Sequence, residues 1–142
     1  MSTLERAIEI AARAHAGQID KAGEAYILHP LQVMLRVKGT HERIAAVLHD
    51  VVEDTPITLA QLRAEGFAEA VIEAVDALTK RSGETRLEAA KRAAQNPIAR
   101  AVKLADNTEN MDLTRIANPT AKDFARLEEY KVVREILIAS RE

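Results

Sequence analysis

The stretch HERIAAVLHDVVED, residues 41–54, sets a regular apolar spacing beside a dense group of polar side chains. Its apolar residues follow the i, i+3, i+4, i+7 spacing of one helix face, at Ile44, Val47, Leu48 and Val51. We therefore expect a helix over His41–Val52, closed by the proline at position 56. Because helical spacing recurs along the chain and strand-like alternation does not, the sequence predicts an all-α fold.

The other expected helices lie between glycine and proline breaks. They run over about Thr3–Ala16, Leu31–Val37, Thr58–Ala64, Phe67–Thr79, Thr85–Ala94, Pro97–Asp112 and Lys122–Ser140. Gly17–Pro30 has no clean period, so we expect an ordered loop there. The chain of 142 residues can bury a sizeable core and shows no repeat or dividing linker. Residues 1–142 are therefore predicted to form a single compact multi-helix bundle.

Composition excludes several function classes. The chain has no cysteine, which removes thiolate metal sites, cysteine nucleophiles and disulfide scaffolds. Its formal net charge of −2 and lack of a basic block make duplex nucleic acid an unexpected partner. No apolar run reaches the roughly 18 residues of a membrane span, and the N-terminus lacks signal-peptide character, so a cytoplasmic location is expected. Alanine-rich faces and a long last helix would suit a homo-oligomer, and would equally suit a monomer core.

The polar side of the 41–54 stretch is the first candidate for chemistry. On a helix, His49, Asp50, Glu53 and Asp54 lie opposite the apolar arc. Such an arc is most often a solvated face. However, three carboxylates near a helix C-terminus are unfavourable for the helix dipole unless a cation is present. A bound metal ion would supply that cation.

Two further residues, Asp106 and His29, could bind the same metal ion. Asp106 lies on or beside the apolar row of the Pro97–Asp112 segment, and Asn110 continues that row. A carboxylate there must be paired, neutral or coordinating, and a cap or a buried salt bridge to an arginine is an equal alternative. His29 precedes a proline and alone would usually be a satisfied loop or core residue. Together these residues form a set without thiolate, suited to Mn, Fe or Zn: His29, His49, Asp50 and Asp106.

Several ordered motifs across about residues 4–135 also carry a family resemblance. They are AHAGQ (14–18), KAGE (21–24), YILHP (26–30), AVLHDVVEDT (46–55), ALTK (77–80) and VKLAD (102–106). With these motifs the chain resembles HD-domain metal-dependent phosphohydrolases, and within them the hydrolase domain of RelA/SpoT homologues and the stand-alone small alarmone hydrolases. The resemblance implies an all-α HD-domain bundle that acts on a small-molecule nucleotide.

The resemblance also implies roles for individual residues. It gives one Mn²⁺, with Fe²⁺ or Zn²⁺ as alternatives, to the ligands His29, His49, Asp50 and Asp106. It makes Glu53 and Asp54 the catalytic pair that handles the attacking water and proton transfer, and it assigns Lys21 and Asn110 to the substrate. The implied reaction removes the 3′-pyrophosphate of (p)ppGpp, the nucleotide of the stringent response, and yields GDP or GTP and pyrophosphate.

One departure from the family pattern affects the substrate. Asp20 stands where the alarmone hydrolases commonly have an arginine that contacts the guanine nucleotide, so the charge is reversed at a position expected to face the substrate. A phosphohydrolase for a different nucleotide or phosphate ester is therefore an alternative. A nucleotide-binding module without turnover is a further one, although it would have no need of Glu53 and Asp54.

Overall fold

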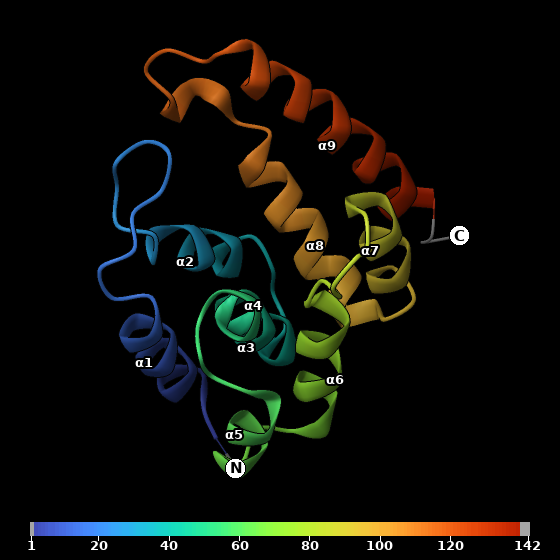
Figure 1. Cartoon of the computed structure of the whole chain (residues 1–142). Coiled ribbons are helices and arrows are strands. Elements are labelled where there is room, and N and C mark those ends of the chain that lie inside the picture. The colour runs from blue at the N-terminus through green and yellow to red at the C-terminus, as the bar shows by residue number, and fades with distance from the viewer. Residues whose placement is uncertain (1, 140–142) are drawn as a thin grey trace.

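A computed structural model describes residues 2–139. Its elements follow one another as α1 (Leu4–Ala14), α2 (Leu28–Leu35), α3 (Thr40–Leu48), α4 (Val51–Asp54), α5 (Leu59–Ala64), α6 (Glu69–Leu78), α7 (Arg86–Ala93), α8 (Pro97–Asn110), the short 3₁₀ helix η1 (Leu113–Arg115) and α9 (Ala121–Ala139) (Figure 1). Within the described range there is no strand, only an isolated bridge between Ile19 and Ala25. The prediction of an all-α fold is confirmed.

Helix α3 is the centre of the bundle. It packs against α1, α2, α6 and α8, and all five residues from Ile44 to Leu48 are buried. Burial on every side exceeds the single apolar face that the sequence predicts, and it identifies a central helix rather than a surface one. Ala45 and Ala46 are completely buried, and their short side chains permit close approach of the neighbouring helices.

Helix α9 packs outside this core. It lies beside α7 and α8 (Figure 1). A second apolar cluster joins these helices through the buried side chains of Ala90, Ala94, Val133 and Leu137, with the half-buried Leu104 packed against it. The long last helix is therefore used inside this chain to cover α7 and α8. Its predicted end at Ser140 lies outside the described residues.

The predicted helix over His41–Val52 is interrupted, which corrects the sequence expectation. Helix α3 ends at Leu48, and α4 starts only at Val51. Nδ1 of His49 lies 2.6 Å from the carbonyl oxygen of Ala46, and the His49 N–H makes a long contact of 3.4 Å to the same oxygen. Asp50 then has φ −102° and ψ −2°, which stays in the αR region but is shifted from the ideal values of an α-helix. A side chain that competes for backbone hydrogen bonds explains the break.

Several other boundaries differ by two or three residues, and two of them bear on the site. Helix α2 begins at Leu28, so His29 and Pro30 belong to its first turn and not to the preceding loop. Proline is tolerated there because the first N–H groups of a helix have no partner inside the helix. The helix predicted to reach Asp112 ends at Asn110, and η1 follows it. None of the described helices is long and apolar enough to cross a membrane.

Candidate metal centre

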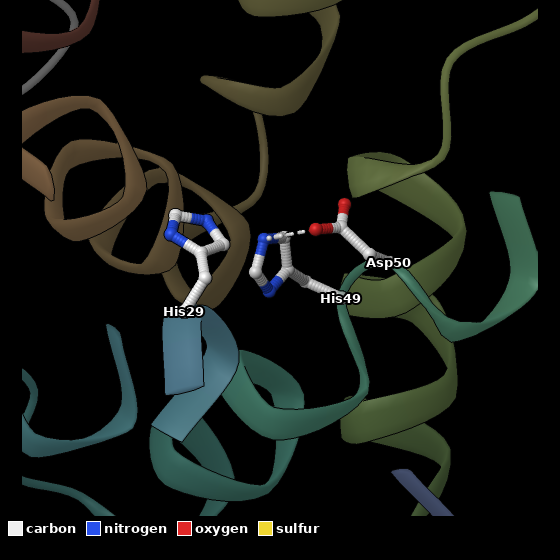
Figure 2. Close-up of side chains that lie close together, drawn as sticks. All are labelled: His29, His49 and Asp50. Carbon is white, nitrogen blue, oxygen red and sulfur yellow. Dashed lines mark ion pairs between the residues drawn. The ribbon is translucent and has the colours of Figure 1, made fainter. Parts of the chain in front are cut away.

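Four polar side chains from three parts of the fold meet at the core surface. His29 comes from the first turn of α2, His49 and Asp50 from the break between α3 and α4, and Asp106 from α8. Nε2 of His29 lies 2.7 Å from Oδ1 of Asp106, although the two residues are 77 positions apart. Nε2 of His49 lies 3.1 Å from Oδ2 of Asp50 and 3.4 Å from Oδ1 of Asp106. Figure 2 shows the two imidazoles and Asp50 gathered in one place.

The His49 ring is oriented for ligation. Because its Nδ1 donates to the Ala46 carbonyl, Nε2 carries the free lone pair when the ring is neutral. That Nε2 is buried and, despite its close carboxylates, has no partner in hydrogen-bond geometry. Divalent ions bind the neutral imidazole, so an ion placed beside Nε2 would replace the proton that Asp50 and Asp106 favour on this ring. One nitrogen of each histidine and a carboxylate oxygen of Asp50 also lie within 4.8 Å of one another. This donor set fits a divalent ion of the Mn, Fe or Zn type.

The charges at the centre are strongly coupled. Burial favours neutral groups here, but Asp50 and Asp106 outweigh it and raise the pKa of His49 well above its usual value. The pKa of Asp106 is lowered, against burial, by the ammonium of Lys103 and by the two histidines. Nζ of Lys103 lies 3.3 Å from Oδ2 of Asp106. The sequence left a buried salt bridge to an arginine open as an alternative for Asp106, and the structure pairs it with a lysine instead.

Tyr26 is a member of the site that the sequence did not indicate. Its hydroxyl donates a hydrogen bond to Oδ2 of Asp50, and burial together with the Asp50 charge raises its pKa. Its ring also contacts the rings of His15 and His29, with centroids 4.9 and 5.8 Å apart. Tyr26 lies in the turn before α2, and no pattern in the sequence indicates its contact with Asp50.

Glu53 and Asp54 lie in α4 beside Asp50, and both are exposed. Oε1 of Glu53 accepts a hydrogen bond of 2.8 Å from the backbone N–H of Lys80, which holds this carboxylate in place. Burial and the charges of Asp50 and Glu53 raise the pKa of Asp54 to about 6. Because α4 begins after Asp50, the two carboxylates lie in the first turn of a new helix. The two carboxylates therefore do not continue α3, although Asp54 is also the last residue of the four-residue α4.

Two cavities flank the centre and share four residues: Asp50, Asp106, Asn110 and Tyr130. The first has a volume of about 360 Å³ and reaches the loop around Lys21. The second has a volume of about 260 Å³ and reaches Glu53. Nδ2 of Asn110 donates to Oδ1 of Asp106 at 3.2 Å, so this amide lies directly beside the centre.

Lys21 lies farther out. Its Nζ makes an ion pair of 3.3 Å with Oδ1 of Asp123, at the start of α9. Both residues line the first cavity, so the ion pair connects two of its walls. The structure therefore places Lys21 at this cavity but not in contact with the four central side chains.

Asp20 also lines the first cavity, but its carboxylate is engaged with its own loop. Oδ1 accepts hydrogen bonds from the backbone N–H groups of Ala22 and Glu24, at 2.8 and 3.0 Å. This is a local turn of the kind that aspartate commonly stabilises. Asp20 thus has a structural task in its loop in addition to the cavity-facing position expected from the sequence, and its effect on the substrate stays a prediction.

The chain belongs to the HD domain family, whose model matches residues 7–132. It is 40% identical over 117 residues to a guanosine-3′,5′-bis(diphosphate) 3′-pyrophosphohydrolase of Haemophilus influenzae, covering 72% of this chain and 17% of that protein. It is 36% identical over 132 residues to a probable GTP pyrophosphokinase of Mycobacterium leprae, covering 84% of this chain and 17% of that one. The chain thus spans about a sixth of the length of these relatives.

A solved structure shows the same fold. It belongs to a metazoan orthologue of SpoT that is described as hydrolysing ppGpp and as having a role in starvation responses. The TM-score is 0.79, and the match covers 99% of this chain and 85% of the other at 23% identity. The predicted HD-domain bundle is therefore confirmed as the fold.

Proposed function

We propose that this protein is a divalent-metal-dependent hydrolase that removes pyrophosphate from the 3′ position of guanosine 3′,5′-bis(diphosphate). The observation that carries the proposal is the unpartnered Nε2 of His49, buried among the imidazole of His29 and two carboxylates. Membership of the HD domain family and a 40% identical relative named for this reaction support it.

In this proposal the metal is Mn²⁺, held by His29, His49, Asp50 and Asp106. Such an ion lowers the pKa of a bound water and neutralises charge on the phosphoryl oxygens. The chain supplies the orientation of these ligands. Ala46 fixes the ring of His49, Tyr26 fixes the carboxylate of Asp50, and Asn110 contacts Asp106 from the substrate side.

The proposed step breaks one phosphorus–oxygen bond. The oxygen of a water attacks the phosphorus nearest the ribose, and the bond from that phosphorus to the ribose 3′-oxygen breaks. Glu53, held by the Lys80 N–H, accepts a proton from the water. Asp54, whose pKa of about 6 lets a fraction of its carboxyl groups keep a proton near neutral pH, gives a proton to the 3′-oxygen. The products are GDP and pyrophosphate.

One feature favours a second candidate, a phosphohydrolase for a different nucleotide. Away from the centre, the described side chains that line the first cavity include more acidic than basic groups. Asp54, Asp112 and Asp123 are among the acidic ones, and Lys21 and Arg126 are the cations found among these described side chains. Such a lining is unfavourable for a nucleotide with several phosphates at its 5′ end. We therefore expect discrimination between nucleotides that differ only in the number of 5′ phosphates.

A nucleotide screen with Mn²⁺-loaded protein tests the proposal. We expect turnover of guanosine 3′,5′-bis(diphosphate), with GDP and pyrophosphate as products separated by anion-exchange chromatography. GDP and GTP themselves, which lack a 3′ phosphate, should not be consumed. Turnover of another nucleotide in the absence of this reaction would establish the second candidate. Tight binding of the nucleotide without any product would identify a binding module and would contradict the proposal.

A further inference from the structure

The second cavity differs from the first in its charge. It is lined by three basic residues, Lys80, Arg86 and Lys103, besides the acidic residues of the centre and Glu53. It reaches Asp50, Asp106 and Asn110 as the first cavity does, but no residue of the Lys21 loop contributes to its lining. A cavity that gathers cations next to a metal centre is suited to an anion with several charges.

Two of the basic residues, Arg86 and Lys103, are held by side-chain contacts, whereas Lys80 is held only at its backbone. Nη1 of Arg86 makes an ion pair of 2.9 Å with Oε1 of Glu129, and its guanidinium lies over the ring of Tyr130, with 5.2 Å from Cζ to the ring centroid. Lys103 reaches Asp106 at 3.3 Å. The backbone N–H of Lys80 is bonded to Glu53. A cation already held in position loses less conformational freedom when it binds an anion.

We infer that the second cavity binds the terminal phosphate of the group that is cleaved and then holds the released pyrophosphate, with Arg86 as its main anion contact. This inference rests on the proposed function, and it divides the substrate between the two cavities. The nucleoside then occupies the first cavity, whose lining includes the apolar side chains of Ile19, Leu113 and Ile116. Pyrophosphate and the nucleoside product leave through different cavities.

The guanidinium of Arg86 has a geometric advantage over a lysine for this task. It offers several N–H donors in one plane, which match the oxygens of a phosphate group. One of its nitrogens contacts Glu129, and that leaves other donors for a ligand. Loss of a charged hydrogen bond of this kind weakens binding by about tenfold or more.

Direct titration of the Mn²⁺-loaded protein with pyrophosphate, given as its manganese complex, tests this inference. We expect the dissociation constant of Arg86→Gln to rise about tenfold over that of the unchanged protein. Arg63→Gln is a matched control, because Arg63 also makes an exposed ion pair of 2.9 Å with a glutamate but does not line either cavity. It should bind pyrophosphate like the unchanged protein. Metal content, measured on each variant, should stay unchanged.

Three results would overturn the inference. The first is that the metal-loaded protein does not bind pyrophosphate. The second is that Arg86→Gln binds it as tightly as the unchanged protein. The third is that Arg126→Gln, which alters the first cavity, loses as much pyrophosphate affinity as Arg86→Gln. The titration needs no turnover, so it is independent of the test of function. Pyrophosphate binding that depends on Arg86 without hydrolysis of the guanosine nucleotide would refute the proposed function alone. Hydrolysis with no such dependence would refute the second-cavity inference alone.

Discussion

The hydroxyl of Tyr26 donates a hydrogen bond to Oδ2 of Asp50, and this contact joins the loop before α2 to the break between α3 and α4. Partners of this kind orient a metal ligand from behind. The ring of the same tyrosine contacts the rings of His15 and His29, so Tyr26 touches two of the four central residues, His29 and Asp50. Substitution by phenylalanine would keep the ring contacts and remove only the hydrogen bond to Asp50, so the two roles can be tested separately.

Tyr26→Phe should weaken Mn²⁺ binding by about 10- to 100-fold, because Asp50 loses the donor that fixes its carboxylate. Titration of metal-free protein with Mn²⁺ measures this effect. Tyr130→Phe is the control, since Tyr130 lines both cavities but no hydroxyl contact to the four central residues is found among the described side chains. Equal metal affinity of Tyr26→Phe and the unchanged protein would show that the contact does not position Asp50.

His49→Ala should abolish the stabilisation of the protein by Mn²⁺. A ligand at 100 times its dissociation constant stabilises a folded protein by about 2.7 kcal/mol, which raises Tm visibly in a thermal scan. The variant lacks the unpartnered Nε2 and should show neither bound metal nor a shift. His41→Ala removes an exposed histidine and should keep both. An unchanged metal content in His49→Ala would exclude His49 as a ligand.

Asp54→Asn should stabilise the metal-free protein in a pH-dependent way. The pKa of Asp54 is raised to about 6 by burial and by the charges of Asp50 and Glu53, so the folded state penalises the ionised carboxylate. This penalty is fully present above pH 6 and disappears as the pH falls below the usual value of 3.8. Thermal scans should therefore show a higher Tm for the variant at pH 7 and no difference in acid below that value.

Asp123→Asn provides a control of opposite sign. Its pKa is lowered, mainly by the backbone N–H of Thr120, so its ionised form stabilises the fold. This variant should be less stable than the unchanged protein at neutral pH, and the difference should vanish as the pH falls below the usual value of 3.8. A Tm gain of Asp54→Asn that persists in acid would contradict the assigned cause.

Leu137→Ala should destabilise the protein by about 2–5 kcal/mol, because the side chain is fully buried between α9 and its neighbours and a cavity remains. Ile138→Ala, one position along, removes a side chain that is 44% exposed and should cost less than about 1 kcal/mol. Chemical denaturation measures both. Similar losses in the two variants would show that the second apolar cluster does not attach α9.

The helical class and most helices could be predicted because apolar spacing reports directly which face is buried. The break at His49 could not, since it depends on a side chain that competes for the carbonyl of Ala46. The start of α2 at Leu28 could not be predicted either, because Pro30 suggested a helix boundary and instead lies in the first turn of this helix. Local hydrogen bonds determine where these helices begin and end, and the spacing of apolar residues contains no information about them.

The candidate site was predictable to a different extent for each residue. Asp106 could be singled out because a carboxylate on a core-facing row needs a partner, and the structure gives it His29 and Lys103. Tyr26 could not be singled out, because its task depends on how the loop folds back onto Asp50. The loop-stabilising role of Asp20 was hidden for the same reason. The ligand and catalytic roles of the site residues stay predictions.

The central claim is tested most directly by incubating the purified protein with guanosine 3′,5′-bis(diphosphate) and Mn²⁺ and quantifying the products by anion-exchange chromatography. The account predicts GDP and pyrophosphate in equal amounts, loss of both when the metal is chelated, and their return when Mn²⁺ is added back. Asp106→Asn, prepared in parallel, should give neither product. Release of orthophosphate in place of pyrophosphate, or undiminished turnover after chelation, would contradict the account.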